Sequence, residues 1–233
     1  VLEYLKSEIE GNSGNDVGEV LEACTARGMR FSTSTLKMVI RSLPTLAPRL
    51  YSQTVSGLRE GGRDKTQLMC RLLRYVKPNG AVVSGLCSSL LAERAQIGNA
   101  IPIFLREASF HLPEDIRLPI IMVGAGTGLA PYLSFLDERK RLLELNDPSI
   151  QLGPAMLYVG YKAPEEALCM DELLEHARNN TVQQLVVAFS RNGADQYKSR
   201  TLPANVRIVG PENIPSTVSS DFQRLAPLIQ HGA

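Results

Sequence analysis

Three glycines lie within five positions at residues 124–128, where the sequence reads Gly-Ala-Gly-Thr-Gly. An apolar run at residues 118–123 precedes them, and Leu129, Ala130 and Pro131 follow. Glycines let the backbone approach a large ligand closely, and the N–H groups that open a helix attract phosphate. The spacing therefore predicts a strand, a tight turn and a helix start that together bind a nucleotide pyrophosphate.

Two common phosphate-binding motifs are excluded by the residues around this turn. The usual dinucleotide fingerprint would need a third glycine at position 129, where the chain has Leu129. A P-loop would need Gly-Lys-Ser/Thr after the turn, and no such sequence follows.

Polar side chains follow two more apolar runs downstream of the turn. Residues 155–161 lead into Lys162, and residues 184–189 lead into Ser190 and Arg191. Ligands bind at the carboxyl ends of strands in an open parallel sheet, so we expect both cations to face the glycine turn. Away from such a turn, two cations of this kind would be read as solvated surface residues. Beside the glycine turn they suit a phosphate additional to the pyrophosphate.

Composition excludes several classes of function. The 233-residue chain has a formal net charge of +1 and no long basic run, so it lacks a general attraction for nucleic acid or an anionic membrane. It contains no apolar stretch of about 18 residues, so no membrane segment is expected. The three histidines are isolated, and Cys24, Cys70, Cys87 and Cys169 are far apart. These spacings indicate no metal site or disulfide framework and favour a reducing, intracellular compartment.

The elements that position these residues fall into three segments. Residues 1–42 have helical periodicity, with Leu2, Leu5 and Ile9 on one face and residues 17–24 on another, and residues 32–35 cap a further helix. Residues 43–115 contain short β-like runs, notably 66–73 and 101–106, which predict antiparallel strands.

Residues 116–233 alternate strands and helices. We expect strands at 118–122, 155–161 and 184–190, a helix from the glycine turn to about residue 144, and a helix over 165–178. This alternation is typical of a doubly wound parallel sheet, so the whole chain is expected to be α/β plus β.

The string from Gly124 to Tyr132 resembles the Gly-x-Gly-Thr-Gly-x-Ala-Pro-aromatic turn of the ferredoxin-NADP reductase superfamily, in particular its diflavin branch, which includes NADPH-cytochrome P450 reductases. The resemblance implies that NADPH is bound, with Ser190 and Arg191 at its 2′-phosphate and Tyr197 beside its adenine. The implied NADPH-binding residues are Gly124, Gly126, Thr127, Gly128, Pro131, Gly160, Lys162, Ser190, Arg191 and Tyr197.

Two further motifs resemble the flavin-binding sequences of that superfamily. Arg49-Leu50-Tyr51-Ser52 is similar to Arg-x-Tyr-Ser, which implies that Arg49 pairs with the FAD pyrophosphate and Tyr51 packs on the flavin. Ser52 would lie near flavin N5 and assist hydride transfer, as the one expected catalytic residue. The second motif, implied to bind the FAD phosphates, consists of Gly85, Leu86, Cys87 and Ser88.

The resemblance gives each segment a role. Residues 1–42 become a helical remnant of a connecting region, residues 43–115 an antiparallel, barrel-like FAD-binding region, and residues 116–233 the NADP-binding domain. Residues 228–233 are similar to the family segment just before its final Cys-Gly strand, so that strand and its cysteine are expected to be missing.

The function implied is an NADPH-dependent oxidoreductase that passes hydride to FAD. In a longer parent enzyme, electrons would continue to FMN or to a haem or iron–sulfur protein such as a cytochrome P450. The parent would be cytoplasmic, or on the cytoplasmic face of the endoplasmic reticulum if it carries an anchor.

Two alternatives remain open. Residues 53–56 read Gln-Thr-Val-Ser where the family has Ile-Ala-Ser-Ser, and the lysine that usually precedes Tyr197 is absent. Both departures favour a catalytically silent nucleotide-binding module. A simpler two-domain flavin reductase is the other alternative, and the helical segment 1–42 counts against it.

Overall fold

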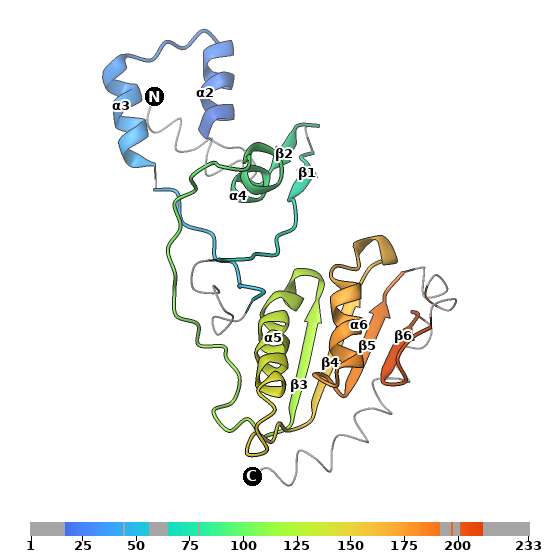
Figure 1. Cartoon of the computed structure of the whole chain (residues 1–233). Coiled ribbons are helices and arrows are strands. Elements are labelled where there is room, and N and C mark those ends of the chain that lie inside the picture. Colours follow the sequence, from blue (N-terminus) through green and yellow to red (C-terminus); the bar gives the residue numbers. More distant parts are fainter. Residues whose placement is uncertain are drawn as a thin grey trace. The chain divides into compact units, whose positions relative to one another are not determined.

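A computed structural model describes residues 17–43, 45–55, 65–78, 80–191, 197 and 201–211 (Figure 1). The chain divides into two compact units. Unit 1 comprises Val1–Leu50 and Leu72–Ala95, and unit 2 comprises Tyr51–Arg71 and Gln96–Ala233. The chain therefore passes from one unit to the other three times.

A parallel sheet forms the centre of unit 2. Its strands are β3 (Ile120–Ala125), β4 (Ala155–Tyr161), β5 (Gln184–Phe189) and β6 (Val206–Val209), in the order β3-β4-β5-β6. Two helices, α5 (Ala130–Glu144) and α6 (Met170–Arg178), connect successive strands and lie on the same face in Figure 1. Successive right-handed crossovers in one direction place helices on one face in this way.

The core of unit 2 lies between this face and the two helices. Burial alternates along β4, so every second side chain faces the helices. Leucines spaced three and four residues apart place an apolar stripe of α5 against the sheet. The largest fully buried side chains include Leu129, Leu133, Leu136, Leu157, Leu173, Leu185 and Phe189. On the opposite face of β3, Ile121 and Val123 are exposed.

Unit 1 combines short helices with a hairpin. Helices α2 (Val17–Ala26) and α3 (Thr33–Ser42) share a small core around Val20 and Cys24. Strands β1 (Arg74–Val76) and β2 (Val82–Ser84) pair antiparallel, and α4 (Leu86–Ser89) continues into the π-helix η1 (Leu90–Arg94). Lys77 Nζ lies 2.8 Å from both carboxylate oxygens of Glu19, which ties the hairpin to α2.

Much of the predicted fold is confirmed. The parallel α/β sheet, the α5 helix, the helical residues 17–24 and the cap at Ser32 all appear, with Ser32 Oγ accepting from Thr35 N at 3.1 Å. The predicted helix over 165–178 begins later, at Met170. A 3-10 turn, η3 (Pro164–Glu166), precedes it, and the left-handed conformation of Cys169 (φ 57°) separates the two.

The antiparallel region departs from prediction. Residues 66–73 form only an isolated bridge between Leu68 and Gln53, and residues 101–108 form no strand. Both runs are apolar enough for strands, but within the described ranges no neighbouring strand pairs with them to form a ladder. The described residues contain one two-stranded antiparallel sheet, and the expected barrel is not confirmed.

Some predictions concern residues outside the described ranges. They include the helix face at Leu2, Leu5 and Ile9, the position before Tyr197, and residues 228–233. Among the described helices, none combines the length and the apolar character needed to cross a bilayer.

Candidate functional site

The glycine turn links the end of β3 to the start of α5. A 3-10 turn, η2 (Gly126–Leu129), follows β3 directly, and Pro131 stands in the first turn of α5. Gly126 has a φ of 52°, in the left-handed region that favours glycine. Among the described residues, no side chain caps η2 or α5, so within this part of the chain the N–H groups that open this helical segment are left to an anion.

The glycines of the turn serve different purposes. A Cβ on Gly124 would lie 2.9 Å from Gly128 O and 3.1 Å from the Tyr132 ring, so Gly124 is required for the turn to close. A Cβ on Gly126 or Gly128 would meet no atom of the described residues within 4 Å. The space beside these two residues is therefore open to a ligand, with Thr127 half-buried between them.

Three strand ends meet beside this turn. The register pairs Ala125 with Gly160, and Gly160 with Ala188. Beyond the strands, Ser190 N donates to Tyr161 O at 2.9 Å and Arg191 N donates to Lys162 O at 3.0 Å. The structure thus brings the predicted residues of three strand ends together at the carboxyl edge of the sheet.

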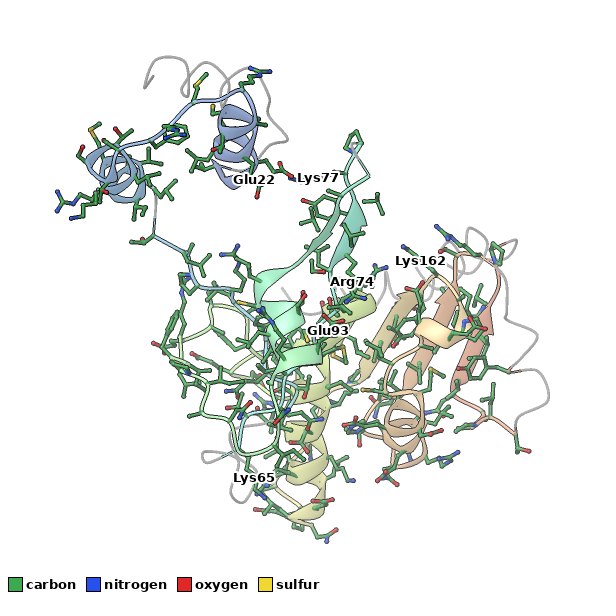
Figure 2. All side chains as sticks on the ribbon, turned by 90° about the horizontal axis from the view of Figure 1, so that it is seen from above. Glu22, Lys65, Arg74, Lys77, Glu93 and Lys162 are labelled. Atoms are coloured by element: carbon green, nitrogen blue, oxygen red, sulfur yellow. The ribbon has the colours of Figure 1, made fainter. Side chains whose placement is uncertain are left out.

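This edge carries positive charge. Lys162 is half-buried and labelled in Figure 2, which views the structure of Figure 1 from above, while Ser190 and Arg191 are exposed. Two cations, a hydroxyl and uncapped N–H groups make a donor set suited to a phosphorylated ligand.

Tyr197 lies in the core of unit 2. It is 6% exposed and stacks on Phe189 with ring centroids 5.5 Å apart and an interplanar angle of 11°. Tyr161 packs on the same Phe189, and its hydroxyl donates to Leu168 O at 2.9 Å. Burial raises the pKa of Tyr161 well above its usual range. The expected contact of Tyr197 with adenine stays a prediction.

The first flavin motif spans both units. Arg49 is exposed in unit 1, with its guanidinium donating to Ala47 O. Tyr51 is half-buried and Ser52 exposed, and both belong to unit 2.

The residues after this motif are fixed within unit 2. Thr54 N donates to Gln67 O at 3.0 Å, and Val55 O accepts from Ser134 Oγ at 3.2 Å. Ser134 lies on α5, one turn beyond Ala130. Sequence reasoning missed this link between the flavin motif and the helix of the nucleotide site.

The second flavin motif is held by its own hydrogen bonds. Gly85 N donates to Leu73 O at 2.8 Å, and Ser88 Oγ accepts from Leu73 N at 3.1 Å. A Cβ on Gly85 would lie 2.5 Å from Ser88 Oγ. Leu86 is exposed and Cys87 is half-buried. Local packing therefore explains Gly85 and Ser88, and the motif stays in unit 1 with Arg49.

Sequence reasoning also missed a buried cation at the opposite, amino edge of the sheet. Arg139 is 3% exposed, and its guanidinium donates to Thr181 O at 3.1 Å and Gly153 O at 2.7 Å. Burial lowers its pKa. Arg139 follows Leu136 by three residues, so the sequence places a cation in the apolar stripe of α5. This position was the sequence signal that could have predicted its burial.

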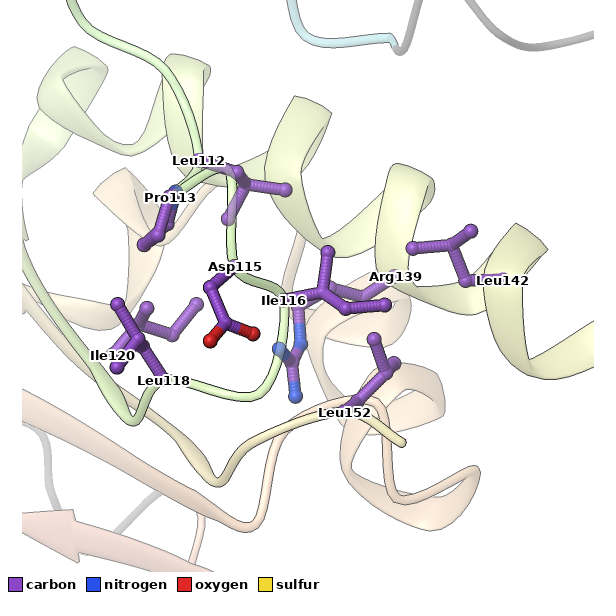
Figure 3. Close-up of a pocket in the computed structure, with 9 residues that line it drawn as sticks. All are labelled: Leu112, Pro113, Asp115, Ile116, Leu118, Ile120, Arg139, Leu142 and Leu152. Atoms are coloured by element: carbon purple, nitrogen blue, oxygen red, sulfur yellow. The ribbon is translucent and has the colours of Figure 1, made fainter. Parts of the chain in front are cut away.

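A small pocket lies beside Arg139. Figure 3 shows the Asp115 carboxylate and the Arg139 guanidinium among apolar side chains, including Ile116, Leu142 and Leu152. Its volume of about 10 Å³ holds roughly one water molecule, far too little for a nucleotide. Asp115 is engaged by Arg117, whose hydrogen bonds lower the Asp115 pKa to about 2. The candidate site is therefore the carboxyl edge.

Comparisons with known proteins relate the segment that contains the carboxyl edge to a known domain family. Residues 122–208 match the oxidoreductase NAD-binding domain family. The chain is 32% identical over 183 residues to NADPH–cytochrome P450 reductase of Musca domestica, covering 78% of this chain and 26% of that protein. It is 36% identical over 177 residues to inducible nitric oxide synthase of Bos taurus, covering 74% of this chain and 14% of the synthase.

A third relative has a more general name. NADPH-dependent diflavin oxidoreductase 1 of Dictyostelium discoideum is 32% identical over 160 residues, covering 67% of this chain and 25% of that protein. The chain thus spans about a quarter or less of the length of these relatives.

Proposed function

Because this chain belongs to the diflavin branch of the ferredoxin-NADP reductase superfamily, we propose that it supplies the NADPH- and FAD-binding part of an NADPH-dependent flavoprotein reductase. The observation that carries the proposal is the carboxyl edge of the unit 2 sheet. There an open glycine turn, three adjoining strand ends and two cations converge.

The residues at this edge fit NADPH. The open space at Gly126 and Gly128 and the uncapped helix start suit the pyrophosphate. Ser190 and Arg191, both exposed, would hold the 2′-phosphate, with Lys162 adding charge from the next strand end. In this proposal residues 116–233 are the NADP-binding domain, and Gly124, Thr127, Pro131, Gly160 and Tyr197 complete the set of NADPH-binding residues.

The flavin motifs fit FAD by their chemistry. The exposed Arg49 guanidinium can pair with a pyrophosphate, and the half-buried Tyr51 ring offers a face to the flavin. The N–H groups of Leu86 and Cys87 open α4, which has no side-chain cap. Residues 43–115 would form this FAD-binding region, with residues 1–42 as a remnant of a connecting region.

The bound cofactors would supply the redox chemistry, with reduced nicotinamide as hydride donor and flavin as acceptor. The chain would orient them. The glycine turn and Arg191 would fix the nicotinamide nucleotide, Arg49 would fix the FAD phosphates, and the exposed Ser52 hydroxyl would hydrogen-bond at the reacting edge of the flavin.

The wider role of the parent protein is also part of the proposal. Electrons would continue from FAD to FMN held elsewhere in the parent, and then to a haem or iron–sulfur protein such as a cytochrome P450. The free thiols of Cys24, Cys70, Cys87 and Cys169 support a reducing compartment, in line with a cytoplasmic protein or one on the cytoplasmic face of the endoplasmic reticulum.

A second candidate function is a nucleotide-binding module without redox activity. The second flavin motif favours it, because the Ser88 hydroxyl already accepts from Leu73 N and donates to Gly85 O, so its hydrogen-bonding groups are used within the protein. Thr54 and Val55, which replace family residues, are buried, with Thr54 N donating to Gln67 O and Val55 O accepting from the Ser134 hydroxyl.

Visible absorption separates the two candidates. The purified chain would be mixed with FAD, desalted and treated anaerobically with NADPH or NADH. Retained flavin bands that bleach with NADPH and poorly with NADH are expected for the reductase. A chain that binds NADP⁺ but retains no flavin would support the silent module.

The flavin assignment has its own control. Arg49→Met should lower the retained FAD, whereas Arg30→Met, another exposed arginine of unit 1, should leave it unchanged. Equal FAD content in both variants would contradict the assignment of Arg49.

A further inference from the structure

Tyr132 closes the glycine turn with a hydrogen bond. It stands on α5 just after Pro131, and its hydroxyl donates to Val123 O at 3.0 Å. Val123 lies on β3 one residue before Gly124. The bond therefore joins the strand that enters the turn to the helix that leaves it.

The Tyr132 ring also lies against the turn. A Cβ on Gly124 would come within 3.1 Å of Tyr132 Cε2, so the ring rests directly on the glycine backbone. Phe110 and Phe135 fix the ring in edge-to-face contacts, with centroids 5.8 and 6.1 Å from it. Such aromatic contacts restrict the ring to one orientation, which keeps the hydroxyl directed at Val123 O.

We propose that Tyr132 is a positioning residue for the nucleotide site, holding residues 124–128 in the shape that receives the pyrophosphate before the ligand arrives. This inference rests on the proposed function of the carboxyl edge. The turn contains three glycines, which have the widest backbone freedom of any residue. Without a brace, the ligand would have to order this segment, and its affinity would fall.

The hydroxyl and the ring can be separated by substitution. Tyr132→Phe removes the hydrogen bond and keeps the ring contacts. Tyr75→Phe is the matched control, because Tyr75 is 51% exposed on β1, belongs to unit 1 and is not one of the residues of the proposed nucleotide site. Both changes remove one hydroxyl and leave the charge unchanged.

The first measurement is hydrogen exchange of the ligand-free chain. Tyr132→Phe should speed exchange at the amides of residues 124–128 by about threefold to tenfold, the ratio that one hydrogen bond confers. Exchange in α6 should be unchanged, and Tyr75→Phe should match the unaltered chain at both places. Unchanged exchange at residues 124–128 would overturn the proposal, whatever the turn binds.

The second measurement is NADP⁺ binding by calorimetry, at a temperature where all variants are folded. Tyr132→Phe should weaken the Kd about threefold to tenfold, and Tyr75→Phe should not change it. Faster exchange together with an unchanged Kd would reject the positioning role and leave only a structural one. An unaltered chain that fails to bind NADP⁺ would contradict the proposed function, while the exchange result would still decide whether Tyr132 holds the turn.

Discussion

The two edges of the unit 2 sheet treat their polar groups in opposite ways. At the amino edge, buried side chains bind the backbone of the segments that enter the strands, as Arg139 does at Gly153 O and Thr181 O. At the carboxyl edge, Gly126 and Gly128 face open space, and Arg191 is exposed. We call the amino edge the closed edge, because its side chains hydrogen-bond to the backbone of the protein itself. We call the carboxyl edge the open edge, because its donors are exposed and can bind a ligand.

More contacts at the amino edge follow this pattern. Asn205 Nδ2 donates to Ala177 O at 2.9 Å and Val182 O at 3.1 Å, and Gln183 Oε1 accepts from Ala155 N at 2.6 Å. These bonds fix the connections that would otherwise leave buried carbonyl and N–H groups unpaired.

The largest difference between the two edges is expected when one glycine at each edge is replaced by alanine. A Cβ on Gly153 would lie 2.2 Å from Arg117 O and 2.4 Å from Leu118 O, so Gly153→Ala should destabilise unit 2 by about 3 to 5 kcal/mol. The added Cβ of Gly128→Ala meets no described atom within 4 Å, so this change should alter stability by less than about 0.5 kcal/mol while weakening NADP⁺ binding. Urea unfolding and calorimetry measure the two effects. Equal stability of the two variants would contradict the assignment of a closed edge.

A matched pair of arginines comes next. Arg139→Met removes the donors of two backbone carbonyls in a buried place, and about 3 kcal/mol of stability should be lost. Arg191→Met removes an exposed cation, so unfolding should hardly change while the preference for NADP⁺ over NAD⁺ falls. If Arg191→Met keeps that preference, Arg191 has no role at the 2′-phosphate.

The closed edge should also respond to pH. His176 on α6 is 5% exposed, its Nδ1 has no hydrogen-bond partner among the described residues, and burial lowers its pKa. Lys140 lowers the pKa further, while Asp137 and Glu175 oppose the shift. The unfolded chain, with a histidine pKa of about 6.5, then binds the proton more readily, so stability is full above that pH and falls as the pH drops below it.

Unfolding in urea at pH 7.5 and 5.5 measures this dependence. His176→Gln should flatten it, since the buried titrating group is gone. If that variant does not fold, NMR titration of the unaltered chain should show a His176 pKa below 6.5, and a higher value would contradict the prediction.

The smallest effect is expected on the outer surface of the two helices. Lys140 Nζ lies 2.8 Å from Glu175 Oε1, with both side chains partly or largely exposed. Exposed ion pairs contribute little and are screened by salt. Glu175→Gln should lower the unfolding midpoint only slightly, and the difference should vanish in 1 M salt. A large loss would mean that this pair belongs to the closed edge.

The open edge was largely predictable from the sequence. Its parts are short runs of neighbouring residues, such as Gly124 to Gly128 and Ser190-Arg191, and each follows an apolar run that forms a strand. Local spacing carries that information because strand, turn and helix start are consecutive in the chain. The parallel sheet then brings the runs together at one edge.

The closed edge and the antiparallel region were not predictable in the same way. The partners of Arg139 are backbone atoms 14 and 42 residues away, and no side-chain pattern marks them. The runs at 66–73 and 101–106 have strand-like composition, yet a strand forms only where another chain segment pairs with it. Ser134 was missed for the same reason, because its bond to Val55 spans 79 residues.

That long bond bears on how the chain folds as it is synthesised. Residues 51–71 leave the ribosome between the two segments of unit 1, but they belong with α5, which emerges much later. Thr54 finds its partner Gln67 within this segment, but the carbonyl of the buried Val55 accepts from Ser134 of α5, which has not yet been synthesised. Until the glycine turn and α5 are synthesised, the nascent chain therefore exposes a segment whose hydrogen bond to α5 cannot form. During this interval the segment is accessible to chaperones and prone to misfolding.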